Sequence, residues 1–152
     1  MAGHEAFGGQ AALEVGAHWQ WMIENWATRN GIRATTESSS VSVEIDLPKA
    51  DRVATMRFTT ASRLLVAFIT DDRSLERDRL ALAAAAANAW NTEQLIPMLS
   101  VWDVRGPHPF LAGVCVLPLT SQMSQPVFDD LADHWLSQVR QMFTRCHQVF
   151  GL

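Results

Sequence analysis

Hydrophobic and polar positions recur along the chain with two periods, and each change of period predicts a new element. In residues 11–30 the apolar side chains return every three or four positions, which is typical of an amphipathic helix. Trp21 lies off this stripe, so we expect it to be half exposed. Asn30 and Gly31 follow, and glycine readily adopts the left-handed conformation that ends helices. The expected buried stripe is Val15, Trp19, Met22, Ile23 and Trp26.

The period then shortens to two, which is the period of strands. Residues 32–40 are polar and predict a connector without regular structure. In residues 41–47 apolar and polar positions alternate, as in a strand with one wet face. Residues 53–59 alternate in the same way, whereas residues 64–70 are almost wholly apolar, which favours a central strand covered on both faces. Short turns between these segments predict an antiparallel meander.

An alanine-rich segment predicts a second helix over residues 75–90, because alanine is the best helix former. Ser74 is well placed to accept from the first free backbone N–H groups of this helix. Residues 95–104 and 109–119 predict two further strands, joined by a turn at Arg105, Gly106 and Pro107.

Pro126 fits the first turn of a long last helix. Its expected apolar stripe is Val127, Leu131, Trp135, Val139, Met142, Cys146 and Phe150. The predicted order is therefore α-β-β-β-α-β-β-α. The predicted fold is an α+β domain, with a five-stranded antiparallel sheet and three helices. We expect one domain over residues 1–152, with the glycine-rich residues 1–10 disordered.

The corner after the alanine-rich helix holds Asn88, Trp90 and Asn91. This Asn-x-x-Asn turn, followed by a hairpin and a long last helix, resembles the YbjN family of bacterial proteins, often described as sensory transduction regulators. The resemblance implies a fold like that of type III secretion chaperones and carries no established reaction. Members often have a charged or Lys-Ala sequence at the fourth strand and an Asp-rich hairpin turn. Here residues 95–98 read Leu-Ile-Pro-Met and the hairpin turn reads Arg-Gly-Pro.

The asparagine pair at this corner and Trp102 in the fourth predicted strand each have two interpretations. Asn88 and Asn91 are expected to cap the helix and tie the turn through side-chain hydrogen bonds, because asparagine competes well for local backbone groups. A binding role is the alternative, since loop residues often carry function. Trp102 is expected in the core, and the alternative is that it lines a groove for an apolar peptide.

Composition narrows the classes of partner. The net charge is −4 and no basic cluster occurs, which argues against nucleic acid and against an anionic membrane surface. Charged residues make up 18% of the chain, so we expect a protein partner to cover some of the apolar surface. We find neither a signal peptide nor an apolar run of spanning length, and two cysteines without paired spacing indicate free thiols. A cytoplasmic protein is expected.

Catalytic, metal-binding and cofactor-binding motifs are not found in the sequence. Cys146 and His147 are neighbours on one helix, so their side chains point about 100° apart and cannot pair as nucleophile and base. Asp130 and His134 share a helix face, but a metal site needs further converging ligands. We therefore expect a non-enzymatic regulator or chaperone-like adaptor that binds a protein. The alternative is a small-molecule enzyme with a pocket under the last helix.

The alanine-rich helix is apolar nearly all round, which is typical of a helix covered on two sides. One face is expected to pack on the sheet, and it consists of Leu75, Leu82, Ala86 and Trp90. The second apolar face, Leu80, Ala84 and Ala87, is expected to meet a second copy of the chain in a homodimer.

Overall fold

The computed structural model describes residues 11–152, so the expected disorder of residues 1–10 lies outside the described residues. Within these residues, three α-helices alternate with groups of strands. The elements in chain order are β1 (Leu13–Glu14), α1 (Val15–Arg29), β2 (Ala34–Thr36), β3 (Val41–Leu47), β4 (Arg52–Ala61), β5 (Leu64–Thr70), a 3₁₀ turn η2 (Arg77–Arg79), α2 (Leu80–Glu93), β6 (Met98–Trp102), β7 (Phe110–Pro118), β8 (Gln122–Met123) and α3 (Gln125–Phe150).

The main sheet has six strands rather than the predicted five, in the order β2-β3-β4-β5-β7-β6. The additional strand is β2, which lies inside the segment expected to be a polar connector. Its three residues are all exposed and pair with β3 through the backbone, from Ala34 opposite Val43 to Thr36 opposite Val41. An edge strand held by backbone hydrogen bonds needs no buried side chains, so the hydrophobic pattern gave no signal for it. A separate two-stranded pair joins β1 to β8.

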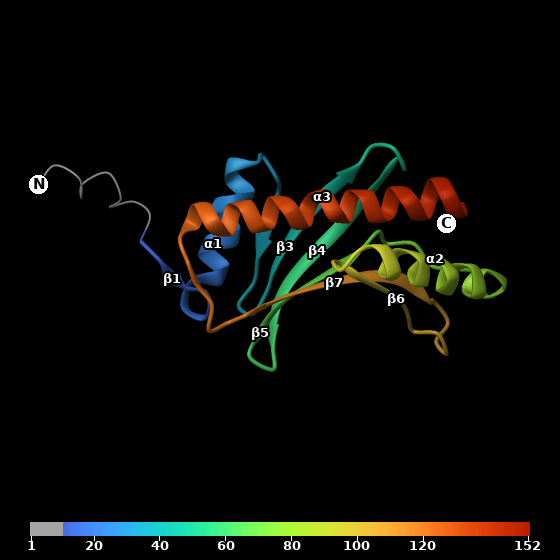
Figure 1. Ribbon diagram of the computed structural model, residues 1–152, viewed down its shortest axis with the longest axis horizontal. Helices are drawn as coiled ribbons and strands as arrows, with labels where there is room; N and C mark the ends of the chain where they lie inside the picture. The colour runs from blue at the N-terminus through green and yellow to red at the C-terminus, as the bar shows by residue number, and fades with distance from the viewer. Residues whose placement is uncertain (1–10) are drawn as a thin grey trace, which may run out of the picture.

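The helices cover one face of the sheet, and the core lies between them. In Figure 1 the red helix α3 runs along the longest dimension of the molecule, with α1 beside its beginning and α2 beside its end. Alternate residues of the central strands point into this core, as the period of two predicted. They include Val43, Ile45, Met56, Phe58, Leu65, Ala67 and Ile69, all essentially inaccessible.

Helix α1 begins four residues later than predicted, because residues 13 and 14 pair with β8 instead. The backbone N–H of Val15 donates to Ser121 O at 2.9 Å, and that of Gly16 donates to Leu119 O at 2.8 Å. A Cβ at Gly16 would lie 3.0 Å from Leu119 O, so glycine permits this close approach. The predicted end at Asn30 is confirmed, and Trp21 is 52% exposed as expected.

Polar contacts join α1 to α3. The indole N–H of Trp26 donates to Asp133 Oδ1 at 2.9 Å, and Arg29 forms an ion pair with the buried carboxylate of Asp129. Ser124 caps α3 by accepting from the backbone N–H of Val127 at 3.4 Å, and Pro126 lies in the first turn as predicted. Most of the predicted stripe of α3 is buried, although Val127 is exposed.

Helix α2 is shifted toward the C-terminus relative to its prediction. It begins at Leu80 rather than Leu75, and Ser74 does not cap it. The backbone N–H of Leu75 donates to Pro109 O at 2.6 Å, which holds this segment extended beside β7. The helix continues past Trp90 to Glu93. Tertiary hydrogen bonding therefore overrides the local helix preference at its start.

Candidate functional site

Trp90 and Asn91 fasten the end of α2 to strand β6. The indole N–H of Trp90 is buried and donates to Pro97 O at 2.7 Å. The side-chain amide of Asn91 donates to Leu99 O at 2.8 Å and accepts from Leu99 N at 2.9 Å. Both residues therefore act on the strand after the corner rather than on the helix.

Asn91 ties the corner through side-chain hydrogen bonds, as expected, but it does not cap the helix, because α2 continues to Glu93. The backbone N–H of Gln94 donates to Trp90 O at 2.8 Å, which continues the helical pattern beyond Asn91. Asn88 is exposed on the outer side of α2. Spacing alone could not show that Asn91 reaches a backbone eight residues away in sequence.

The exposed side of α2 differs partly from the predicted dimer face. Ala84 is exposed and Leu80 is half-buried, but Ala87 is buried within the chain. Leu82, expected on the buried stripe, is 38% exposed, while Ala83 takes its place in the core beside Ala86. The helix therefore buries Ala83, Ala86, Ala87 and Trp90. Its free apolar surface consists of Ala81, Leu82, Ala84 and Ala85.

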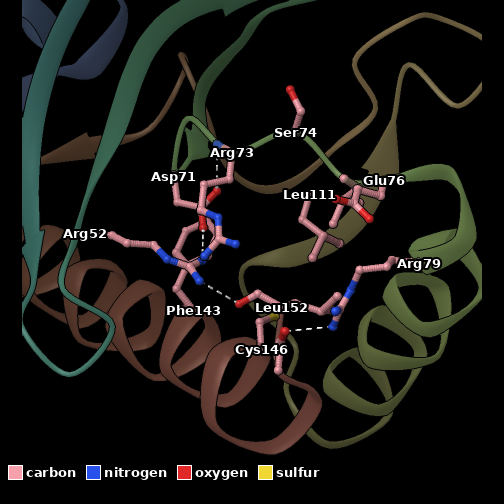
Figure 2. A pocket seen from close by; sticks show the side chains of 12 residues that line it. Arg52, Asp71, Arg73, Ser74, Glu76, Arg79, Leu111, Phe143, Cys146 and Leu152 are labelled. Carbon is pink, nitrogen blue, oxygen red and sulfur yellow. Dashed lines mark hydrogen bonds and ion pairs between the residues drawn. The ribbon is translucent and has the colours of Figure 1, made fainter.

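A recess of about 180 Å³ lies beneath the end of α3, and charged side chains line it. Figure 2 shows Arg52 and Asp71 on one side of it and Arg79 on the other. Arg52 Nη1 forms an ion pair with Asp71 Oδ2 at 2.8 Å, and its Nη2 donates to Leu152 O at 2.9 Å. Arg79 Nη2 donates to Gly151 O at 2.7 Å. The two guanidinium groups thus hold the last turn of α3, where the helix dipole favours cations.

The titratable groups of this recess are strongly influenced by burial. Burial raises the pKa of Asp71, and the neighbouring Arg52 opposes that shift. Burial also raises the pKa of Cys146 to about 11. A thiol with such a pKa stays protonated at neutral pH and is a poor nucleophile. His147 Nδ1 lies 3.1 Å from Arg52 Nη2, which places the ring beside a cation rather than beside Cys146 as a base.

The sheet face turned away from the helices carries an apolar surface that we call the outer aromatic patch. The rings of Phe68 and Trp102 meet edge to face with centroids 5.0 Å apart, and those of Phe68 and Phe110 with centroids 6.3 Å apart. Trp102 is 42% exposed and Met98 is 55% exposed. The patch consists of Phe68, Met98, Trp102, Phe110, Val114 and Val116, contributed by β5, β6 and β7.

The small residue beneath these rings explains how they meet. Ala112 points to the same outer face, since it pairs with Thr70 on β5 and with Ser100 on β6. It is nevertheless fully buried, as expected for a small residue among large rings leaning across it. The expectation that β5 is covered on both faces is therefore only half met, because Phe68 is partly exposed there. Trp102 belongs to the exposed patch and not to the core, contrary to the favoured interpretation of the sequence.

A shallow hollow of about 460 Å³ adjoins the outer aromatic patch at one end of the sheet. Phe68 and Phe110 form part of its wall, and Asp72 and Asp103 also line it. Both acidic residues have positive φ angles, 61° and 54°, a conformation that aspartate tolerates better than most residues. The sequence contained no signal for this hollow, because its walls come from two strands and two loops that are distant in the chain.

Within residues 11–152, no group of three or more histidine, cysteine and acidic side chains is arranged so that it could hold a metal ion. Both cysteines are buried and free. Over the same residues, no helix is both long and apolar enough to cross a membrane.

Neither a protein-family model nor a curated protein matches the chain. Among solved structures, the chain is similar to YbjN from E. coli, a protein described as a candidate transcription regulator. The similarity has a TM-score of 0.67 and covers 84% of this chain and 90% of that one, at 12% sequence identity. The chain therefore has the fold seen in YbjN, in agreement with the resemblance of the corner motif.

Proposed function

We propose that this chain is a non-enzymatic, YbjN-like regulator or chaperone-like adaptor that captures an apolar segment of a partner protein. The observation that carries the proposal is the outer aromatic patch. Contiguous apolar patches are rare on the surface of monomeric soluble proteins, and where they occur they often mark an interaction site. Large aromatic side chains such as Trp102 are also the residues that dominate binding energies at protein interfaces. The likeness to YbjN, and through it to type III secretion chaperones, supports the same class.

The patch is suited to an extended or helical segment because it spans three strands. Phe68, Val114 and Met98 lie opposite one another on β5, β7 and β6 and form one apolar row across the sheet. A segment laid along such a row would remove several large side chains from water at once, which stabilises association by the hydrophobic effect. The row itself contains no charged residue, and the exposed Arg57 lies opposite Phe68 on β4, at the edge of the patch, where its charge can stay in water.

The recess beneath the end of α3 supports the second candidate, a small-molecule enzyme. Its charged residues converge and Asp71 has a raised pKa, as titratable groups of active sites often do. However, Arg52 and Arg79 already bond to the backbone of residues 151 and 152, and Asp71 pairs with Arg52. These contacts give the recess a structural task, so the adaptor function is favoured.

The proposed function also includes an oligomeric state, a cellular location and a class of partner that is not bound. We propose a homodimer through the free surface of α2 that includes Ala84 and borders the half-buried Leu80. This interface leaves the outer aromatic patch open to a different partner. We also propose a cytoplasmic location and no binding of nucleic acid. The sparse, scattered basic residues and the net charge of −4 support the last point.

Panning a random peptide library displayed on phage against the folded protein tests the adaptor function. We expect apolar peptides that bind the native protein and lose at least tenfold in affinity against Trp102→Ser. Trp21→Ser is the matched control, because Trp21 is similarly exposed but lies on α1, away from the patch. Failure to select any peptide whose binding depends on Trp102 contradicts the proposed function.

A further inference from the structure

We propose that the segment bound by the outer aromatic patch carries a lysine or arginine, whose side chain enters the adjoining hollow between Asp72 and Asp103. This inference rests on the proposed function and adds the chemistry of the partner.

The topology brings the two acidic residues together. Strands β5 and β6 both pair antiparallel with β7, so they run in the same direction on either side of it. Their C-terminal ends therefore lie at one end of the sheet and flank the beginning of β7. Asp72 follows β5 and Asp103 follows β6, while Phe110 begins β7 between them.

The turn chemistry fixes the position of Asp103. The backbone N–H of Gly106 donates to Asp103 O at 2.9 Å and closes the turn. A Cβ at Gly106 would overlap the Asp103 carboxylate, which lies against the glycine. The carboxylate can occupy this place only because residue 106 has no side chain.

Arg73 also lines the hollow, but its guanidinium group extends into the recess beneath the end of α3. Figure 2 shows the Arg73 side chain turned toward Arg52 and Asp71 in the recess beneath α3. The other polar lining groups of the hollow are the hydroxyls of Thr70 and Ser74 and the ring of His108. Arg77 is the cation at the Asp103 turn, and its guanidinium donates to Val104 O at 3.2 Å and to Gly106 O at 2.8 Å, so backbone carbonyls engage it. Among residues 11–152, neither Asp72 nor Asp103 forms an ion pair.

Both the methylene stem and the charged head of a basic side chain suit this hollow. The methylene stem of a lysine or arginine packs on apolar surface while its head stays near polar groups. Phe68 and Phe110 supply that surface, and their ring faces also attract a cation. The two carboxylates then accept hydrogen bonds from the charged head. The net charge of −4 additionally favours the approach of a basic partner over an acidic one.

The peptides selected by panning provide the first test. Lysine or arginine should be enriched next to the apolar residues that depend on Trp102. A selected basic peptide should lose about tenfold in affinity for the double variant Asp72→Asn/Asp103→Asn, and most of its dependence on salt. Asparagine also tolerates positive φ angles, so the turns are expected to keep their conformation.

The matched control is Asp130→Asn/Glu37→Gln, which changes the net charge equally. Asp130 is exposed on α3 and Glu37 is exposed in the loop before β3, both away from the hollow. Affinity for the basic peptide should stay within about twofold of the native value. An equal loss in this control overturns the proposal, because the effect would then be one of overall charge.

The remaining outcomes separate this proposal from the adaptor function. Apolar peptides without basic enrichment, bound equally by the Asp72→Asn/Asp103→Asn variant, overturn the basic partner and leave the adaptor function standing. Absence of any Trp102-dependent peptide overturns both. Self-association that is abolished by Trp102→Ser assigns the patch to a second copy of the chain and also overturns the basic partner.

Discussion

The side-chain amide of Asn91 makes both backbone hydrogen bonds of Leu99, donating at 2.8 Å and accepting at 2.9 Å. Strand β6 is the last strand of the sheet on its side, and β7 pairs with its other edge. Asn91 thus occupies the place that the backbone of a further strand would take. The bond pair also links the end of α2 to the sheet.

Replacing Asn91 by alanine should destabilise the fold by about 1–3 kcal/mol, because it leaves the Leu99 N–H and C=O without their partners. Urea denaturation followed by circular dichroism measures the change. Asn88→Ala is the control, since Asn88 is exposed on the same helix. It should leave stability within about 0.5 kcal/mol or raise it slightly, because alanine favours helices. Equal losses in both variants would show that the Asn91 bonds contribute nothing specific.

Trp90→Phe should cost about 1–3 kcal/mol while keeping an aromatic ring in the core, because the buried Pro97 carbonyl loses its donor. Trp21→Phe provides the comparison at an exposed tryptophan, and we expect it to change stability by less than about 0.5 kcal/mol. Both free energies can be obtained from chemical denaturation. A loss below about 0.5 kcal/mol for Trp90→Phe would contradict the role assigned to the indole N–H.

Stability should fall as the pH rises above about 9, the ordinary thiol pKa. Burial raises the pKa of Cys115 to about 12 and that of Cys146 to about 11. Between the unfolded and folded pKa values the unfolded thiols lose their protons and the folded ones retain them, which favours unfolding. Each thiol then contributes a slope of about 1.4 kcal/mol per pH unit.

Urea denaturation at several pH values from about 8 to about 10.5, which covers the lower part of this window, measures the slope. The variant Cys115→Ala/Cys146→Ala is expected to be less stable throughout, because it leaves small cavities, but its stability should depend less on pH. An identical pH dependence in the native protein and the variant would exclude the thiols as its source.

Ala84→Glu should convert the proposed homodimer to a monomer without loss of helical circular dichroism, because Ala84 is exposed within one chain and the charge would lie in the contact. Light scattering after size exclusion gives the mass of both forms. Ala83→Glu is the contrasting variant and should unfold the chain, since Ala83 is fully buried. A native protein that is monomeric at tens of micromolar refutes the dimer.

Much of the fold could be predicted from the sequence where a single face of an element is buried. The alternation of Val43 and Ile45 with polar residues gave the strand β3, and the stripe through Trp26 gave α1. Elements whose position depends on distant backbone partners were missed or shifted. Strand β2 exists through its pairing with β3, and α2 starts late because Leu75 bonds to Pro109 O.

The candidate site was much less predictable than the fold. The sequence identified Trp90 and Asn91 as distinctive, but their partners Pro97 and Leu99 became evident only in three dimensions. Trp102 was expected in the core because apolar residues usually lie there. Its exposure follows from the absence of a helix over the outer face of β5, β7 and β6 in the described part of the chain, which a pattern within one strand cannot reveal.

The contacts of Arg52 have a consequence for the folding kinetics. Its hydrogen bond to Leu152 O joins residues 100 positions apart in the sequence. Closing so large a loop costs chain entropy, and folding slows as the average separation of contacting residues grows. The last turn of α3 is therefore expected to dock late, after the hairpin of β4 and β5 has formed. Changes at Arg52 should mainly accelerate unfolding and leave the folding rate nearly unchanged.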